Sequence, residues 1–427
     1  MTGTTRRDVL KAAVATGGAV GLSACLDIAG ESDVPQGPDD PSTLPERQYA
    51  WGEHVRRDDA GNEQLPGHQV LLYLTLERDG VPTEGDREQV ATAFDSLSRA
   101  YAWESEGLLW SAAYSPSYFD RYEEPLHDAV ECPPPHALSP FEQPEFDDQD
   151  VLVHLASDNP DVVLRAEQAL LGAEDGANGV TFEASLDGVA SLADESVDRR
   201  TGFVGAGMPA ERQADLEGIP EDGPVPDASP LFMGFKAGFA GNQATEDYVA
   251  IEEGPFAEGT TKHVSNIRQR LADWYDEQNF EERVMEMFSP KHAEEGWVEG
   301  VGTNLGDASR VDETLDDIEA QAREHGRIGH AQKAARANRD EAGNVRLLRR
   351  HFESADDGVA SLHFPSLQQR MSEFDAVRAA MNGTDLTGVT PAVRQRVNNG
   401  ILEYIFVVRR GNWVVPPRSK LALPRPR

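Results

Sequence analysis

The chain has 427 residues, of which 75 are acidic and 39 are basic, so its formal net charge at pH 7 is −36. Such a length allows two or three domains, or one large domain in two parts. The acidic excess runs along the whole chain without one dense tail. It therefore predicts a surface adapted to very high salt, where the Debye length is about 3 Å, rather than an acidic face for a basic partner. Nucleic acid is excluded as a partner, because phosphate binding needs a basic footprint.

The N-terminus has the pattern of a targeting segment. Arg6 and Arg7 form a twin arginine before apolar residues, which is typical of Tat export, and the apolar run 12–22 is too short to span a membrane. Leu22-Ser23-Ala24-Cys25 resembles a lipobox. We expect a Tat signal peptide over 1–24 and a lipid on Cys25 that anchors the exported protein to the cell surface outside the cytoplasm. Ordinary cleavage with an incidental cysteine is the alternative.

The segment after the signal has the composition of a linker. Residues 25–48 are rich in proline and aspartate and lack apolar periodicity, which predicts a flexible tether. Cys132 is the only cysteine besides Cys25, so a lipid on Cys25 would leave no partner for an intramolecular disulfide. Two cysteines also exclude thiolate metal clusters and CxxC redox chemistry.

Residues 49–190 are predicted to form the N-terminal half of an α+β fold. Strands and helices alternate in the order β-α-β-β-α-β, the plan of a ferredoxin-like unit. The predicted strands are 68–76, 108–114, 150–157 and 180–186, and the predicted helices are 87–103 and 159–171. Residues 191–229, rich in Gly, Pro and Asp, are predicted to link this half to the next.

Residues 230–427 repeat the plan with insertions and are predicted to form a second ferredoxin-like half. Runs typical of strands and amphipathic segments typical of helices again follow one another. The predicted strands are 247–252, 263–267, 345–352, 358–364 and 401–408, and the predicted helices are 268–275, 280–288 and 372–381.

Residues 234–238 read Gly-Phe-Lys-Ala-Gly, between other apolar and glycine residues. This stretch resembles the Gly-x-x-Asp-Gly loop of the dye-decolourising (DyP-type) haem peroxidases, with Ala237 where that family has aspartate. Further resemblances follow in the family's order, over roughly residues 68–424. They are Phe119-Asp120-Arg121, residues 150–161, residues 338–350 ending in Leu348-Arg349-Arg350, residues 358–364, and residues 413–417.

The resemblance implies haem b and an axial histidine. Imidazole suits haem iron, and His330 stands where the family has its proximal histidine. His325 is the second choice, and an exposed histidine on a polar helix is the plain alternative for His330. On the other side of the haem the resemblance places Arg349, as the cation that stabilises charge in bound peroxide, and the loop residues Gly234, Phe235 and Gly238.

Ala237 has no proton to transfer, so the resemblance implies hydrogen-peroxide-dependent oxidation of a small-molecule reductant with weakened peroxide activation. General acid–base assistance is typically worth about 10²–10⁴-fold. One alternative is a haem-binding or structural surface lipoprotein that kept the fold and lost catalysis, and another is an exported protein without a cofactor. Homo-oligomer formation stays open.

Overall fold

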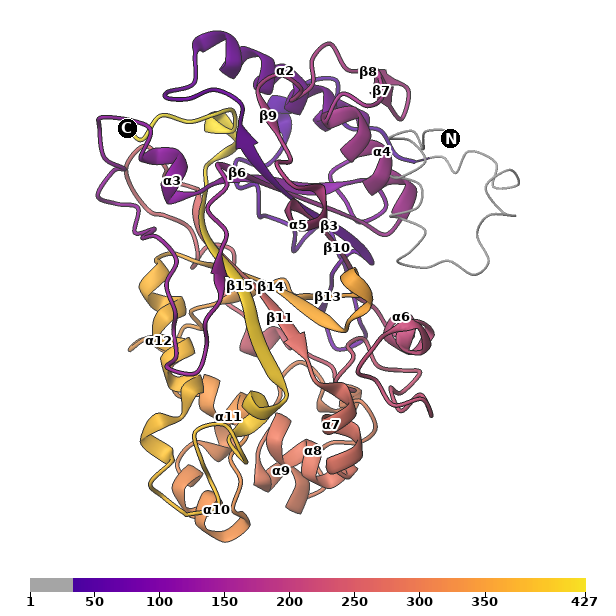
Figure 1. The fold of residues 1–427 in the computed structure, drawn as a ribbon, viewed down its shortest axis with the longest axis vertical. Helices are drawn as coiled ribbons and strands as arrows, with labels where there is room; N and C mark the ends of the chain where they lie inside the picture. Colours follow the sequence, from indigo (N-terminus) through magenta and orange to yellow (C-terminus); the bar gives the residue numbers. More distant parts are fainter. Residues whose placement is uncertain (1–33) are drawn as a thin grey trace.

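The computed structural model describes residues 34–427 (Figure 1). The predicted signal peptide, with Arg6 and Arg7, and the predicted lipid site Cys25 lie outside the described residues. The described part of the expected tether, 34–48, packs against both halves. Gly37 donates to the Arg99 carbonyl (3.0 Å), and the buried Gln48 accepts from the Ala112 N–H (2.7 Å) and donates to the Pro416 carbonyl (2.7 Å). The prediction of a flexible tether is therefore wrong for this part.

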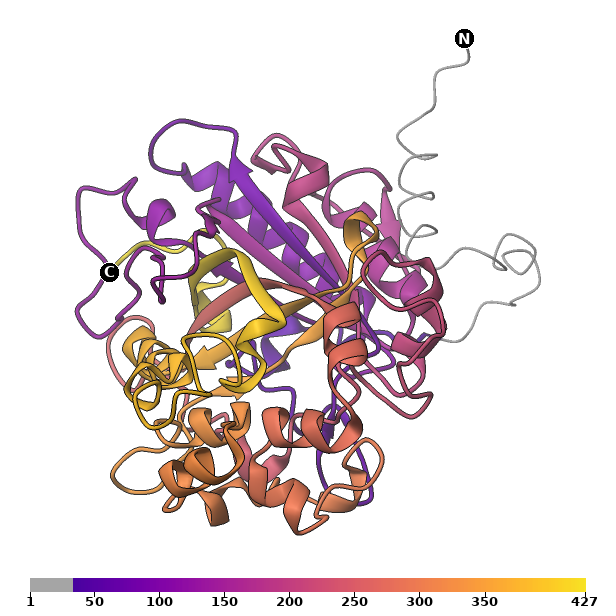
Figure 2. The same ribbon diagram turned by 60° about the horizontal axis from the view of Figure 1, so that its bottom comes forward.

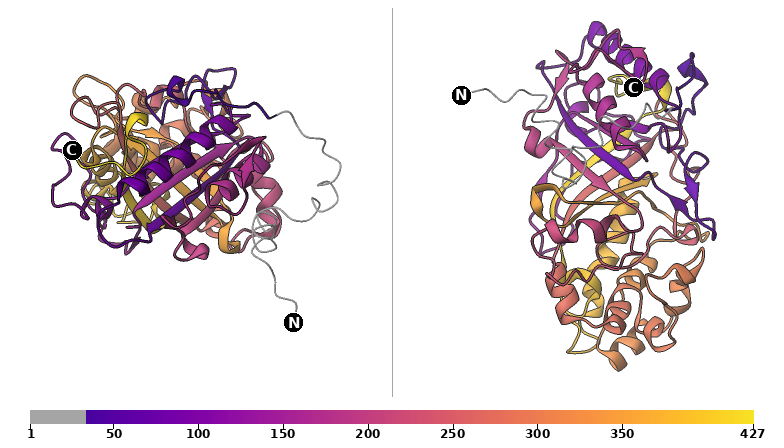
Figure 3. Two further views of the ribbon diagram at one scale, coloured as in Figure 1. Left: turned by 90° about the horizontal axis from the view of Figure 1, so that it is seen from above. Right: turned by 90° about the vertical axis from the view of Figure 1, so that its right-hand side faces the viewer.

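The N-terminal half is a four-stranded antiparallel sheet covered by two helices on one face (Figures 1 and 3). The strands β10, β3, β6 and β4 lie side by side in that order, which is 4-1-3-2 in chain order, as expected of a ferredoxin-like unit. The elements are β3 (His68–Leu76), α2 (Glu84–Ala100), β4 (Leu109–Tyr114), β6 (Val151–Ser157), α4 (Pro160–Leu170) and β10 (Arg199–Phe203).

Local sequence explains where the two helices begin. The Thr83 side chain and Asp86 form a capping box at the start of α2, and Asn159 caps α4 with Pro160 in its first turn. Val90, Phe94 and Leu97 recur on one face of α2 and are buried against the sheet. The predicted helix–sheet packing of this half is confirmed.

The fourth strand is not where the sequence predicted it. Residues 180–186 contribute only β8 (Val180–Thr181) of a small hairpin, whereas β10 lies in the segment expected to be a linker. β10 pairs with β3 through Arg199 to Phe203 and buries two arginines. Arg199 binds Glu167 and Arg200 binds Asp147, so partners distant in sequence stabilise a strand that looks polar.

The C-terminal half repeats the same sheet. Its strands run β13, β14, β11, β15, which is again 4-1-3-2 when read from β15. α12 packs on β11 and β14 as α4 packs on β6. The elements are β11 (Thr260–Gln269), β12 (Leu348–Arg349), β13 (Phe352–Ser354), β14 (Ser361–Gln368), α12 (Met371–Asn382) and β15 (Ile405–Val415). Residues 247–252 form no strand, although Val249 and Ile251 are buried.

The two sheets join at both edges. Phe203 of β10 pairs with Glu353 of β13, and Tyr114 of β4 pairs with Val414 of β15. The fourth strand of each half therefore pairs with the second strand of the other half, and the strand path closes on itself (Figure 3).

One connection distinguishes the halves. The N-terminal half joins its first two strands through α2, whereas the C-terminal half inserts a group of short helices that lies at the bottom of Figure 1 and comes forward in Figure 2. These are α7 (Leu271–Glu277), α8 (Phe280–Met287), α9 (Pro290–Glu294), α10 (Ile318–His325) and α11 (His330–Ala335).

Short elements complete the described chain. They are β1 (Arg56–Arg57), β2 (Glu63–Gln64), α3 (Pro116–Phe119), β5 (Glu145–Phe146), β7 (Gly176–Ala177), β9 (Ala190–Ser191), α5 (Glu195–Asp198), α6 (Met208–Arg212) and nine 3₁₀ turns: η1 (Pro41–Thr43), η2 (Gln213–Asp215), η3 (Ala240–Asn242), η4 (Thr303–Leu305), η5 (Val311–Thr314), η6 (Asp356–Gly358), η7 (Thr384–Leu386), η8 (Gly400–Glu403) and η9 (Arg418–Lys420). Within residues 34–427, none of the helices has the length and apolar character needed to cross a bilayer.

Candidate functional site

His330 is the first residue of α11, and its backbone is held by η8. A Cβ atom on Gly400 would lie 2.9 Å from the Cα and 3.0 Å from the N of His330, so only glycine allows this approach. Gly400 also has φ +59° and donates its N–H to the Ile328 carbonyl (2.8 Å). The close contact with the Gly400 backbone thus fixes the position of His330, the predicted axial ligand.

The His330 side chain has an open nitrogen. It is only partly exposed, and its Nδ1 is buried without a hydrogen-bond partner. Burial, followed by the charge of Lys333 and then Arg349, lowers the pKa of His330 to about 3. At neutral pH the imidazole is uncharged, which is the form that binds metals.

Arg349 lies in β12 opposite Ser366, and Gln243 holds it on both sides. The Gln243 side-chain oxygen accepts from the backbone N–H and the Nε of Arg349 (3.1 Å each), and its amide donates to the Arg349 carbonyl (3.0 Å). Arg349 Nη2 donates to the Asn242 carbonyl (2.8 Å). Burial lowers the pKa of Arg349 to about 10, so the group remains a cation at neutral pH.

The glycine-rich loop 234–238 lies between these two regions. Gly234 and Gly238 have φ +87° and +77°, and a Cβ on Gly238 would be 3.9 Å from the Gln243 amide nitrogen. The loop therefore approaches the group that orients Arg349. Ala237 itself is partly exposed.

Phe235 extends from the loop in the opposite direction, into the helical insertion. Its buried ring lies edge-on to Phe288 at 5.5 Å, and the Phe288 carbonyl accepts from the Gln332 N–H in α11 (3.3 Å). A Cβ on Gly234 would meet the Tyr275 hydroxyl at 2.9 Å. Gly234 and Phe235 thus pack within the protein, and they connect the loop to the helices rather than to Arg349.

Sequence reasoning missed His351, two residues after Arg349. It is buried, its ring stacks on Phe364 at 5.8 Å, and its Nδ1 has no hydrogen-bond partner. Burial, and then the charge of Arg349, lowers the pKa of His351 to about 3. Its charge in turn contributes to lowering the pKa of His330. The sequence could have indicated this residue, because successive side chains of a strand point to opposite faces of the sheet and residues 349 and 351 therefore share a face.

The intervening Arg350 lies on the other face. Its guanidinium lies 4.4 Å from the centre of the Trp51 ring and pairs with Glu246 at 2.9 Å. Of the two arginines in Leu-Arg-Arg, Arg349 is therefore the one that lies near His330. The second choice, His325, ends α10, is partly exposed and lies 3.8 Å from the Glu294 carboxylate.

Basic groups gather around His330. Lys333, Arg349, His351 and Arg378 all lie close enough to lower its pKa. Within the described part of the chain, Arg378 pairs with Glu142 (3.2 Å), and no carboxylate forms an ion pair with Arg349 or His351. In a chain with a net charge of −36, two basic groups that have no carboxylate partner in the described part, Arg349 and His351, suit an anionic ligand.

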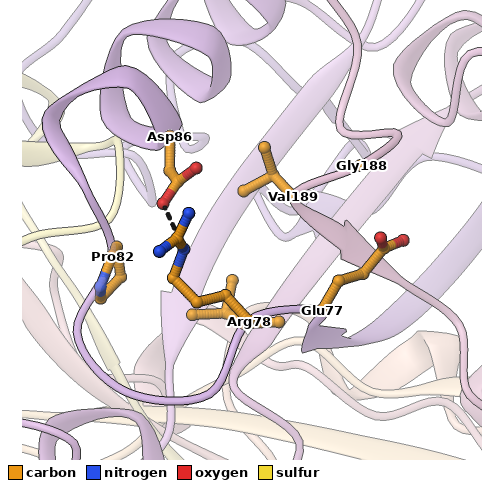
Figure 4. Close-up of a pocket in the computed structure, with 7 residues that line it drawn as sticks. Glu77, Arg78, Pro82, Asp86, Gly188 and Val189 are labelled. Atoms are coloured by element: carbon orange, nitrogen blue, oxygen red, sulfur yellow. Dashed lines mark ion pairs between the residues drawn. The ribbon is translucent and has the colours of Figure 1, made fainter.

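Pockets on the N-terminal half contain none of these residues. One, of about 230 Å³, is lined by Glu77, Arg78, Pro82, Asp86 and their neighbours, and its Arg78 and Asp86 form an ion pair at 3.3 Å (Figure 4). Another, of about 580 Å³, includes Arg121, which pairs with Asp150 at 2.6 Å. In each pocket the arginine is already paired and the remaining charged side chains are acidic, so we favour the region around His330 as the site for an anionic ligand.

The strand order and the closed path of the sheet define a fold. The structure is similar to that of a variant of DypB from Rhodococcus jostii RHA1 in complex with heme, with a TM-score of 0.53 and 14% identity over 88% of this chain and 97% of that one. It is also similar to the encapsulated DyP-type peroxidase from Mycobacterium smegmatis, with a TM-score of 0.50 and 15% identity over 85% of this chain and 96% of that one. The chain thus has the fold of the DyP-type peroxidases, as the resemblance predicted.

The sequence itself places the chain in a family. The model of the family DUF7405, described as a family of unknown function, matches residues 66–417, and the chain belongs to that family. None of the curated protein sequences matches the chain.

Proposed function

We propose that this protein binds haem b through His330 and uses it for hydrogen-peroxide-dependent oxidation of a small-molecule reductant. The observation that carries the proposal is the juxtaposition of an uncharged imidazole with an open nitrogen and a cation, Arg349, that has no carboxylate partner among the described residues. The DyP-type fold supports it, because DypB, which shares that fold, is in complex with heme.

The residues present fit the cofactor. His330 offers one neutral donor to an iron, and the basic surroundings suit an anionic porphyrin. Within residues 34–427 no cluster of three or more His, Cys, Asp or Glu could hold a metal ion, which fits a site with a single protein ligand. The only cysteine in the described part, Cys132, is buried, so the haem would be held without a covalent bond, as haem b.

Bound haem would supply the iron at which peroxide is reduced. Arg349, held by Gln243 and Asn242, provides a fixed positive charge beside that space, and such a charge stabilises an anion as it forms. Ala237 can neither donate nor accept a proton. Peroxide turnover is therefore expected to be slower than with a carboxyl at this position, by up to about 10²–10⁴-fold.

The direct test is the absorbance of protein purified from a haem-replete host. Wild type should show a Soret band, and His330→Ala should lose it. His325→Ala is the matched control, because that histidine is also partly exposed but has the carboxylate of Glu294 beside it, and the variant should keep the band. The proposal is wrong if wild type binds no haem, or if His325→Ala and not His330→Ala abolishes binding.

Ala237 favours a second candidate, a haem-binding surface protein without turnover. Ala237→Asp separates the two: if the chain is a weakened peroxidase, restoring the acid should raise the rate of peroxide consumption by at least tenfold at equal haem content. No increase, with haem bound, would favour the non-catalytic candidate.

We further propose that the protein is exported by the Tat pathway and anchored by a lipid on Cys25, with a surface adapted to high salt. The twin arginine at Arg6 and Arg7, the Leu-Ser-Ala-Cys sequence and the net charge of −36 support this. Replacing Arg6 and Arg7 by lysine should retain the protein inside the cell, and Cys25→Ala should release it from the membrane fraction.

A further inference from the structure

His351 differs from three other buried histidines of this fold. It shares an open Nδ1 with His363, but His363 has its Nε2 3.9 Å from the Asp356 carboxylate. His154, His263 and His292 each have both ring nitrogens within hydrogen-bonding distance of a partner. The partners are Gln69 and Lys262 for His154, Asn412 and Ser265 for His263, and Ser289 and the Ser309 carbonyl for His292. His351 is equally buried, yet its Nδ1 has no partner. A buried polar atom left open costs about 1–3 kcal/mol, so its retention points to a ligand.

The backbone places His351 with Arg349. Both follow the alternation of the extended segment that pairs with β14, and Arg350 between them points the other way, to Trp51 and Glu246. Stacking on Phe364, with 15° between the ring planes, fixes the imidazole orientation. His351 is therefore a rigid group of the sheet, on the face that carries the fixed cation.

The groups around His351 leave it uncharged when the site is empty. Burial, and then the charge of Arg349 from β12, lowers the pKa of His351, and His351 in turn contributes to lowering the pKa of His330 from α11. No carboxylate in the described chain forms an ion pair with it. An anion bound beside Arg349 would raise the pKa of His351, because a nearby negative charge favours the imidazolium. His351 is thus poised to gain a proton when an anion forms next to it.

We propose that His351 is the proton acceptor of this site, in the role that the alanine at position 237 cannot fill. The inference rests on the proposed haem site. A weak acid that enters, such as hydrogen peroxide or hydrogen cyanide, gives its proton to the His351 imidazole. The resulting anion stays beside Arg349, and the proton stays on His351 until the anion leaves or is protonated again.

Cyanide binding to the ferric haem-loaded protein tests this without turnover, because hydrogen cyanide must lose a proton to bind as an anion. At neutral pH, His351→Ala should slow cyanide association by about 10²-fold or more, with haem content unchanged. His351→Gln, which keeps polar volume but is not basic, should be slowed to a similar degree. His136→Ala, at an exposed histidine 3.9 Å from Asp375, is the control and should match wild type.

The outcomes separate this inference from the proposed function. If wild type binds no haem, both are wrong. If haem binds and His351→Ala or His351→Gln associates with cyanide as fast as wild type, only the proton acceptor is wrong. A low-spin ferric spectrum in wild type that becomes high-spin in both variants would make His351 a second axial ligand and overturn the inference. Loss of haem from both variants would also overturn it, by assigning His351 to haem retention.

Discussion

The two halves of the molecule have the same strand order, but among the described residues the buried histidine nitrogens without a partner all lie in the C-terminal half. In the N-terminal half, His154 on β6 lies between Gln69 and Lys262, and its ring contacts Trp51 and Phe352. In the C-terminal half, His263 and His292 are partnered in the same way, whereas His330 and His351 each keep an open Nδ1. His154 forms a hydrogen bond between the two sheets, whereas His330 and His351 belong to the candidate site around Arg349. His330 belongs to α11 of the helical insertion, and His351 lies between β12 and β13 of the sheet.

The comparison teaches that burial alone does not identify a functional histidine here. Burial is the largest cause of the lowered pKa of His154, His330 and His351 alike. What separates them is whether each ring nitrogen has a partner. Partnered groups contribute to stability, and open groups are available to a ligand, so the two kinds should respond differently to mutation.

The largest expected effect is on stability, from removing a partnered histidine. His154→Ala should lower the free energy of unfolding by about 3 kcal/mol, because it leaves the buried Lys262 without its imidazole partner and opens space beside Trp51. His330→Ala should cost less than about 1 kcal/mol in the haem-free protein, since the side chain has no hydrogen bond at Nδ1 to lose. Urea unfolding at neutral pH measures both, and equal losses would contradict the distinction.

A somewhat smaller effect is expected at Gly400, where backbone supports the open site. Gly400→Ala should cost about 2–3 kcal/mol, because alanine disfavours φ +59° and its Cβ would lie 2.9 Å from the His330 Cα. Gly61→Ala is the matched control, since Gly61 has φ +82° with no atom within 4 Å of an added Cβ, and it should cost about 1 kcal/mol. Thermal unfolding compares the two. Similar losses would mean that the contact with His330 can relax.

The smallest effect is a pH dependence at the closed interface. Burial, with the charge of Arg350, lowers the pKa of Lys262 from 10.5 to about 7. Between these values the unfolded chain binds the proton and the folded protein does not, so stability rises with pH across this window. Below about pH 7 both states are protonated and the full cost of burying the charge remains.

Lys262→Met removes this dependence. The free energy of unfolding of wild type relative to the variant should rise from pH 7 to pH 9, by at most about 1.4 kcal/mol per pH unit. Urea unfolding of both proteins at the two pH values measures the difference. A constant difference would mean that Lys262 keeps an ordinary pKa in the folded protein.

Sequence patterns located most of the N-terminal half because its elements are stabilised locally. β3, α2, β4, β6 and α4 agree with the predicted segments to within a few residues, and capping residues and apolar periodicity mark them. The pattern failed where stability comes from distant partners. β10 depends on Glu167 and Asp147, and the apolar run 247–252 is buried without forming a strand.

The sequence by itself determined the acidic character, the two-part α+β plan, the order of the DyP-like segments, and His330, Arg349 and Ala237 as residues to consider. Only the tertiary structure decided which groups meet. It placed Arg349 near His330 and Arg350 on the opposite face of the sheet. It also brought Gln243 into hydrogen-bonding distance of Arg349, and His351 to the same region. The reason is physical: an open nitrogen is defined by the absence of partners from other elements, and those elements come together only in the folded chain.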